Sequence, residues 1–296
     1  YNPAISHGLT FPAEKFRLGI HPGGQLIALP VIAGFVGADT VACLLAVNLE
    51  EEKKMTLMID IGTNGEMVLG NRERMVTCST AAGPAFEGAK IECGMRGAAG
   101  AVDHVKYEEG KWNYTTVGNK PAVGLCGSGL IDLVAGLLDA GMLDENGVLR
   151  SGQEKQGVFI LVPPERGGNE RGVYLTQKDL GEVQLAKAAI AAGIQMLMER
   201  LGITEDDICS VYIAGAFGNY MDPVSAGKIG LLPATLVKKV KPVGNAAGEG
   251  AKIALVNEKE MLEMDELVRK IEFVELAASA DFQDHFIDEL GFETGE

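Results

Sequence analysis

The sequence is poor in the residues that disulfides and metal clusters require. It has 5 cysteines and 4 histidines in 296 residues, with no C-x-x-C pair and no histidine at a metal-ligand spacing from a cysteine. We therefore expect scattered core thiols in a reducing cytosol, with no disulfide and no cysteine-bound metal. The histidines are isolated from one another, and we assign none of them a catalytic role: His7, His21, His104 and His285.

Basic residues are also in short supply. The 26 lysines and arginines are outnumbered by 41 aspartates and glutamates, which leaves a net charge of −15. Because a nucleic-acid backbone or an anionic membrane surface would repel such a chain, neither is an expected partner. The hydrophobic content of 47% is enough for a sizeable core, and the length suits one large or two medium domains. The sequence starts at Tyr1 with no basic segment leading into an apolar one, so we expect no signal peptide in it.

One apolar run, from Leu26 to Val47, is long enough to raise the question of a membrane span. Residues that a bilayer disfavours interrupt it: Pro30, Gly34, Gly37 and Asp39. A buried strand from Leu26 to Gly34, a glycine turn and a helix from about Asp39 or Thr40 would use the same residues without placing a carboxylate in lipid. We therefore predict no membrane span.

Short apolar runs separated by turns occupy residues 53–82. Two runs flank a glycine-rich turn, and a third follows a turn at 70–72, a pattern typical of a β-meander. The run from Leu57 to Ile61 is nearly all apolar, as in a central strand that is covered on both faces.

Helical periodicity appears twice in the middle of the chain. The segment from Ser128 to Gly141 has apolar residues on a helical period, with a serine cap and a glycine stop. A longer helix is predicted from about Leu180 to Leu201, with a capping box at Thr176 and Asp179 and a stop at Gly202.

Strands and helices continue to alternate towards the end of the chain. A strand near 210–214 runs into a glycine turn, and a small-residue helix follows near 244–256. The last forty residues predict an acidic helix, a strand over 271–276 and a terminal acidic helix. This alternation predicts the α/β class. Residues 108–119 and 151–172 are interpreted as surface loops or small insertions. In the domain organisation, we place small insertions of the second lobe around 84–120 and 151–176.

An internal repeat suggests two similar halves. The segment Ile32–Gly37 (IAGFVG) recurs as Ile213–Gly218 (IAGAFG), with an offset of 213 − 32 = 181 residues. Both copies are predicted at the end of an apolar strand that turns into a helix. If the duplication is real, residues 1–50 are the tail of a first half and residues 51–296 a second half. A chance match within an apolar glycine turn is the alternative.

The turn at 60–66 (DIGTNGE) has the composition of a phosphate and metal site. Gly62 and Gly65 would let backbone N–H groups approach an anion, Thr63 and Asn64 are donors to phosphoryl oxygens, and Asp60 is a ligand for Mg²⁺. The alternative is a type I′ hairpin at 64–65 with an ordinary turn carboxylate.

Three further glycine-rich segments are candidates for ligand contacts. The turn at 215–219 (GAFGN) would seat an adenine and its ribose against bare backbone. The segment 124–129 opens a helix whose N-terminus would bind an anion, or it is only a structural cap. No G-x-x-x-x-G-K-[ST] occurs, and the 124–129 spacing does not fit a dinucleotide fingerprint. Within 83–97, either Glu87 or Arg96 faces a cleft, or the segment is a packed loop.

These motifs, in their order along the chain, resemble the superfamily of acetate and sugar kinases, Hsp70 and actin. Within it, IDIGTNGE, AAGPAFEG, GLCGSGLID and IAGAFGNYMDP look like the C-terminal domain of reductive activators of corrinoid proteins. The resemblance covers most of the chain and implies a ribonuclease-H-like lobe, preceded by the tail of a similar lobe. That family also has an N-terminal iron–sulfur domain and a first phosphate hairpin of the D-x-G-T-T-T type, neither of which is in this sequence. We therefore expect ATPase activity in the full-length protein and none in this part alone.

The resemblance further implies that ATP hydrolysis drives an electron from the iron–sulfur cluster onto a Co(II) corrinoid, which becomes Co(I). Asp60 would bind Mg²⁺ and act in catalysis together with Glu66, a position where the wider superfamily often has a hydroxyl. The ATP-binding residues it implies are Gly62, Thr63, Asn64, Gly65, Gly127, Ser128, Gly215, Ala216, Phe217, Gly218 and Asn219. A corrinoid protein is the expected partner, a homodimer the expected assembly and the cytoplasm the expected location. A small-molecule kinase of the same fold and a non-catalytic docking or dimerisation domain are the alternatives.

Overall fold

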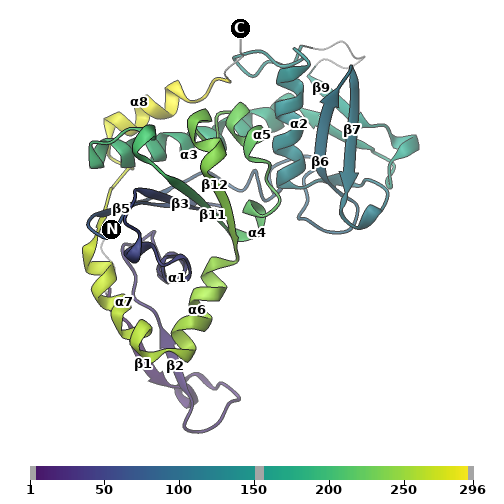
Figure 1. Ribbon diagram of the computed structural model, residues 1–296. Helices are drawn as coiled ribbons and strands as arrows, with labels where there is room; N and C mark the ends of the chain where they lie inside the picture. Colours follow the sequence, from purple (N-terminus) through teal and green to yellow (C-terminus); the bar gives the residue numbers. More distant parts are fainter. Residues whose placement is uncertain (1–4, 151–156, 293–296) are drawn as a thin grey trace.

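The computed structural model describes residues 5–150 and 157–292, apart from the side chain of Ala216. A six-stranded sheet lies at its centre (Figure 1). In spatial order its strands are β12 (Val240–Gly244), β11 (Ser210–Ala214), β3 (Thr56–Ile61), β4 (Gly65–Gly70), β5 (Met75–Thr80) and β13 (Ile271–Phe273).

Strand directions divide this sheet into two parts. β3, β4 and β5 form the predicted antiparallel meander, whereas β11 runs parallel to both β3 and β12. β13 runs parallel to β5 at the far edge. Because β3 and β11 are parallel neighbours, their carboxyl ends meet at one edge of the sheet, with Ala214 opposite Asp60.

Helices cover both faces of the sheet, which confirms the α/β class. Alternate residues of β3 enter two separate cores, because successive side chains of a strand point to opposite faces. Leu57 and Ile59 pack in the core of α2 (Gly127–Asp139) and α3 (Gln177–Leu201). Met58 packs with α1 (Ala38–Val47), α6 (Ala246–Val256) and α7 (Glu258–Lys270). The prediction of a strand buried on both faces is confirmed.

The long helix α3 ends at Leu201 as predicted, but it begins at Gln177, three residues before the predicted Leu180 and directly after the predicted cap residue. Thr176 and Asp179 form the capping box, and Gly202 closes the helix in the left-handed conformation. The predicted serine cap of α2 is wrong: the cap residue is Cys126, and Ser128 lies inside the first turn.

A smaller β-rich region lies beside the central sheet (Figure 1). Its three-stranded sheet is made of β6 (Ala101–Glu108), β7 (Lys111–Thr116) and β8 (Gly124–Leu125), and its two-stranded sheet of β9 (Val158–Val162) and β10 (Val173–Thr176). Residues 108–119, interpreted from sequence as a loop or insertion, instead hold the end of β6, the hairpin turn and β7. In the second such segment, 151–172, residues 158–162 form β9, and residues 151–156 lie outside the described part.

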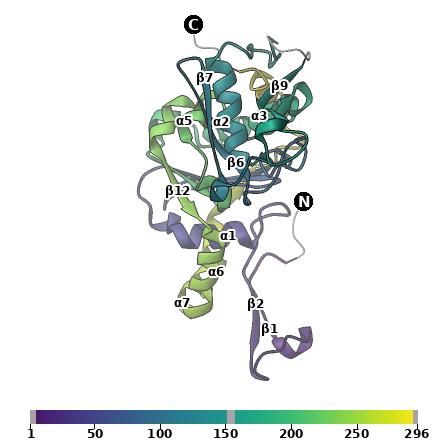
Figure 2. The same cartoon turned by 90° about the vertical axis from the view of Figure 1, so that its right-hand side faces the viewer.

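Residues 9–28 form a two-stranded ribbon that projects from the body in both ribbon views (Figures 1 and 2). Its two antiparallel strands are β1 (Leu9–Pro12) and β2 (Gln25–Ala28). The strand predicted to reach Gly34 therefore ends at Ala28, and Ala33 bridges Val36 in a tight turn before α1. The prediction that both repeat copies sit at a strand end is wrong for the first copy.

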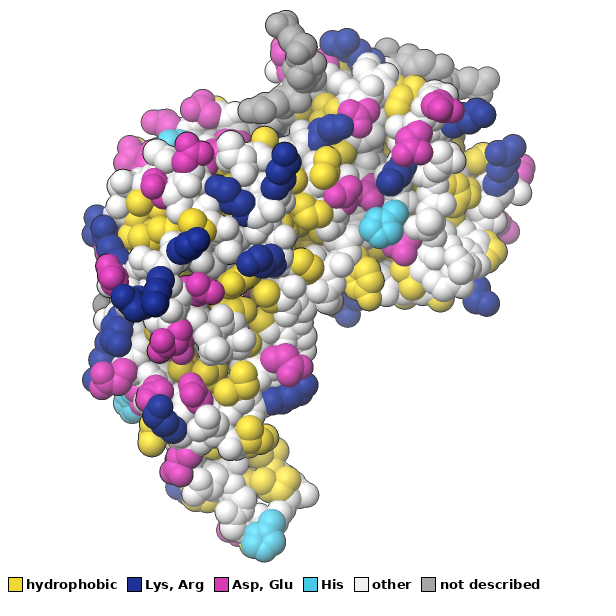
Figure 3. Space-filling model, in the orientation of Figure 1, with side chains coloured by type: hydrophobic (Ala, Val, Ile, Leu, Met, Phe, Trp, Pro, Cys, Tyr) yellow, Lys and Arg dark blue, Asp and Glu magenta, His cyan; other side chains and the backbone are white. Residues whose placement is uncertain are grey.

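The remaining helices within residues 5–150 and 157–292 are short or peripheral. Three are α-helical: α4 (Gly215–Gly218), α5 (Pro223–Lys228) and α8 (Ala280–Asp288). Six are 3₁₀ turns: Ala13–Phe16, Leu49–Glu51, Val117–Asn119, Pro164–Arg166, Glu205–Asp207 and Ala234–Lys239. Over the residues described, no helix is both long and apolar enough to span a bilayer. Acidic and basic side chains are interspersed on the face seen in Figure 3, so the acidic excess is not gathered there in one patch.

Candidate active site

The β3–β4 hairpin places the first group of predicted site residues. Asp60 is opposite Glu66 across the two strands, and the amide of Gly62 donates to the carbonyl of Asn64 at 2.9 Å. Neither Asn64 nor Gly65 has a positive φ, so the alternative of a type I′ turn at these residues is wrong. Thr63 and Asn64 are exposed at the tip.

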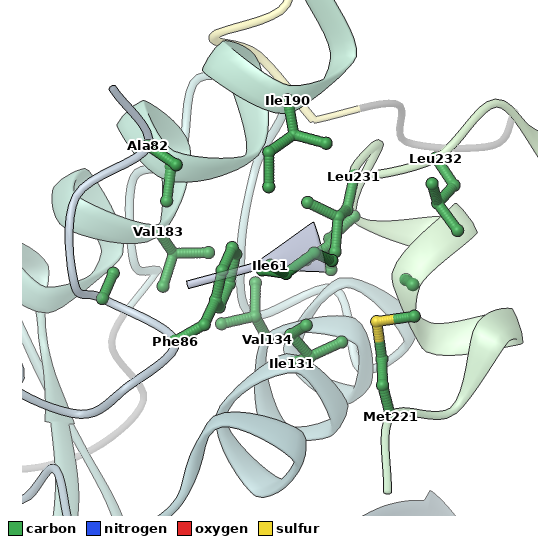
Figure 4. Packing of buried hydrophobic residues seen from close by; sticks show 14 of the residues in the cluster. Ile61, Ala82, Phe86, Ile131, Val134, Val183, Ile190, Met221, Leu231 and Leu232 are labelled. Atoms are coloured by element: carbon green, nitrogen blue, oxygen red, sulfur yellow. The ribbon is translucent and has the colours of Figure 1, made fainter. Parts of the chain in front are cut away.

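Gly65 has a packing role in this hairpin. A Cβ at this position would lie 2.9 Å from Oγ1 of Thr80 and 3.2 Å from Cγ1 of Ile190 on α3. The hairpin therefore rests directly on the core beneath it, where Ile61 lies among side chains of α2 and α3 (Figure 4). The base of the hairpin therefore has no room for a side chain at position 65.

Negative charge accumulates at the base of the hairpin. Burial raises the pKa of Asp60, and the nearby charge of Asp39 raises it further, while the thiol of Cys43 lies 3.8 Å from Oδ2 and has the opposite effect. Burial likewise raises the pKa of Glu66, whose Oε1 accepts a hydrogen bond from Ser79 at 3.2 Å. In the described residues no lysine or arginine forms an ion pair with any of these three carboxylates. The site is therefore suited to a cation.

The glycine turn after β11 meets this hairpin. Gly215 has a φ of +87°, in the left-handed region, and a Cβ there would lie 3.0 Å from Oδ1 of Asp60. Gly218 packs closely on β11, since its Cβ would lie 2.5 Å from Cγ2 of Ile213. Asn219 is exposed beside Gly244 at the end of β12. Ala216 lies between Gly215 and Gly218 in the backbone of α4.

A pocket of about 600 Å³ opens between the glycine turn, the start of α2 and the small β-rich region. Phe217 stacks on Phe86 in its wall, with ring centroids 5.6 Å apart and planes 16° from parallel. A Cβ on Gly127 would meet the carbonyl of Phe86 and the ring of Phe217, so α2 begins directly against this wall. The lining residues are Ile61, Phe86, Glu87, Met95, Arg96, Gly97, Asp103, Val117, Gly118, Cys126, Gly127, Ser128, Phe217 and Tyr220.

The predicted site residues therefore fall into two adjacent groups. Gly127, Ser128 and Phe217 line the pocket, whereas Asp60 and Glu66 lie at the hairpin beside it. Both Glu87 and Arg96 line the pocket, so the segment 83–97 faces a cleft. The β-rich wall at 103 and 117–118 and the aromatic ring of Tyr220 were not predicted. The sequence marks these residues only by their position near the glycine motifs. That position does not indicate that the fold brings them together in one pocket.

Comparison with known proteins identifies the family. Residues 54–296 match the family model of the C-terminal domain of RACo, the ASKHA domain (acetate and sugar kinase, Hsp70 and actin), and residues 1–52 match the RACo middle region. The chain belongs to the RACo family. This match confirms the family resemblance inferred from the motifs. It also confirms the expected lobe of the ASKHA superfamily.

Relatives of this RACo-family chain have named activities. It is 39% identical over 285 residues to the corrinoid activation enzyme RamQ of Eubacterium limosum, covering 91% of this chain and 48% of that protein. It is 29% identical to the [Co(II) methylated amine-specific corrinoid protein] reductase of Methanosarcina barkeri, covering 96% and 55%. A solved reductive activator for a corrinoid, iron–sulfur protein superposes with a TM-score of 0.91 at 38% identity, covering 99% of this chain and 48% of that one. The chain thus spans about half the length of these relatives.

Proposed function

We propose that this chain is the second ATPase lobe of a reductive activator that returns a Co(II) corrinoid protein to Co(I). The observation that carries the proposal is the contact between Asp60 and Gly215, which brings two nucleotide motifs distant in sequence to one edge of the sheet. The names of the relatives support a corrinoid protein as the partner. Residues 1–50 would be the tail of a preceding lobe.

The residues at this edge fit a magnesium nucleotide. Mg²⁺ in nucleotide sites takes one or two carboxylates together with phosphate oxygens, and the described residues form no cluster of three or more side chains able to ligate a metal alone. Asp60 would hold the ion, in surroundings that already carry surplus negative charge. When bound, Mg²⁺ neutralises charge on the phosphates.

In this proposal the hairpin tip binds the phosphates of the nucleotide and the pocket binds its nucleoside. The exposed Thr63 and Asn64 would donate to phosphoryl oxygens, and Glu66, close to Asp60, is the second proposed catalytic carboxylate. The pocket has a volume suited to a small molecule and an aromatic wall against which a nucleoside can pack. Phe217 supplies that wall, and Gly127 lets α2 approach it. The electron donor, an iron–sulfur cluster, is proposed for a part of the protein that this sequence does not contain.

Calorimetric titration of the full-length protein with Mg-ATP and Mg-ADP tests the nucleotide site, since this chain spans about half the length of its relatives. We expect saturable binding by the wild type and at least about tenfold weaker binding by Asp60→Asn, because the substitution removes the carboxylate proposed to bind Mg²⁺. Asp284→Asn on the exposed face of α8 removes the same charge far from the hairpin and is the matched control. Binding that is unchanged in Asp60→Asn would refute the proposed site.

The corrinoid partner, the homodimer and the cytoplasmic location are parts of the same proposal. An acidic chain with a net charge of −15 suits a partner that presents a basic patch. An assay with the full-length protein tests the partner. It measures the reduction of the corrinoid protein in the presence of ATP through the change in the corrinoid's visible absorption. Loss of that reduction in Asp60→Asn would tie it to the hairpin.

A further inference from the structure

Glu87 joins the pocket to the phosphate hairpin. Its side chain lines the pocket, and its Oε2 accepts a hydrogen bond from Oγ1 of Thr63 at 3.0 Å. Its other oxygen lies 3.8 Å from the position of a Cβ on Gly62. Asp103, the other acidic residue of the lining, instead accepts a hydrogen bond from Thr115 on β7 at 2.6 Å. Glu87 is thus the pocket carboxylate that contacts the hairpin.

The backbone around Glu87 is held in place on both sides. Phe86 is buried in the stacked pair with Phe217. Gly88 has a φ of +78° and packs so tightly on the backbone of residues 94–95 that a Cβ would lie 2.6 Å from the amide nitrogen of Met95. The amide of Gly83 donates to the carbonyl of Thr63 at 2.8 Å. Glu87 therefore stays beside the hairpin although its side chain is exposed to solvent.

The hydroxyl of Thr63 has a single proton to donate. While that proton is directed to Glu87, it is not available to a phosphoryl oxygen, and a phosphate arriving at the hairpin also meets the negative charge of the carboxylate. We propose that Glu87 takes the place of a phosphate on Thr63 and competes with the terminal phosphate of a bound nucleotide. This inference rests on the proposed function. Its consequence is a limited affinity for phosphates and easier release of the phosphate-bearing product.

A calorimetric comparison of Mg-ATP with adenosine, on the full-length wild-type protein and on its Glu87→Ala variant, tests the competition. We expect Glu87→Ala to tighten Mg-ATP binding by about fivefold or more, since a like charge at about 4 Å costs about 1 kcal/mol even in water. Adenosine, which has no phosphate, should bind as before. In a Thr63→Ala background the gain from Glu87→Ala should fall well below its value in the wild-type background, because no hydroxyl is left to compete for.

A charge-matched variant separates this competition from general repulsion. Asp103→Asn removes one negative charge from the same pocket without releasing Thr63. A gain as large as that of Glu87→Ala would assign the effect to long-range charge and overturn the inference. Weaker Mg-ATP binding in Glu87→Ala would also overturn it, because the carboxylate would then help to hold the ligand. If neither Mg-ATP nor adenosine binds the full-length protein or any variant of it, the proposed function itself fails.

Discussion

Asp60 occupies surroundings that disfavour its negative charge. Burial and the neighbouring Asp39 both raise its pKa, so its ionised form is less stable in the folded chain than in the unfolded one. For an acid with a raised pKa, folding is favoured when the group is protonated, and this contribution is lost as the pH rises through the folded-state pKa. The residue proposed to bind Mg²⁺ therefore lowers the stability of the metal-free fold at neutral pH.

Asp60→Asn should accordingly stabilise the chain while it weakens nucleotide binding. The amide is neutral at every pH, so its thermal midpoint should exceed that of the wild type at pH 7. The difference should shrink as the pH falls through the raised pKa of Asp60 and should vanish where the carboxyl is protonated in both states. Thermal unfolding across this pH range, without Mg²⁺, measures it. A midpoint at pH 7 below that of the wild type would show that the carboxylate is stabilising.

At the residue scale, the sequence predicts the types of group in the site better than their positions. A carboxylate at the end of an apolar strand and a glycine turn after another strand are local patterns, and both lie where the motifs indicate. The contact of Glu87 with Thr63 joins residues 24 apart, and it depends on how the segment 83–88 folds back over the hairpin. Periodicity does not encode such a reversal.

At the scale of elements, prediction depended on how local the stabilising interactions are. The helix α3 was predicted because its capping box and its glycine stop lie next to it in sequence. The hairpin of β6 and β7 was missed because its turn, Glu109–Gly110, has only one glycine although both residues have positive φ. Its stability comes from distant contacts, including Trp112 against Phe159 on β9, with ring centroids 4.9 Å apart.

The capping box of α3 also connects the helix to the pocket segment. Asp179 is fully buried, and its two oxygens accept hydrogen bonds from Thr176 and from the amide of Glu92 at 2.9 Å. Asp179→Ala should lower the free energy of unfolding by about 1–3 kcal/mol, because it removes the buried acceptor that pairs with the amides of Thr176 and Glu92. Urea unfolding measures this. Asp207→Ala, in the exposed capping box with Thr204, is the control and should cost less; an equal loss would show that burial of Asp179 is unimportant.

At the scale of the whole molecule, the sheet separates two hydrophobic cores, and residues 1–52 contribute to one of them. The helix α1 supplies Val41, Leu44 and Leu45 to the core that contains Met58 of β3. Its backbone touches α6 so closely that a Cβ on Gly250 would lie 1.8 Å from the carbonyl oxygen of Ala42. The segment that matches the middle-region model is thus packed against the segment that matches the C-terminal domain.

Removal of residues 1–50 should therefore damage the remaining lobe, although the sequence suggests a boundary there. Deletion removes α1 from the core that covers one face of the central sheet and leaves only α6 and α7 there. We therefore expect residues 51–296 to unfold at a markedly lower urea concentration with a broader transition. Deletion of residues 1–30 removes the β1–β2 ribbon but keeps α1, and its transition should stay closer to that of the full chain. If residues 51–296 alone unfold as cooperatively and at the same midpoint as the full chain, α1 is a dispensable appendage and the lobe is complete without it. If the loss follows α1 and not the ribbon, the folding unit of this lobe begins before residue 38, within the segment that matches the middle region.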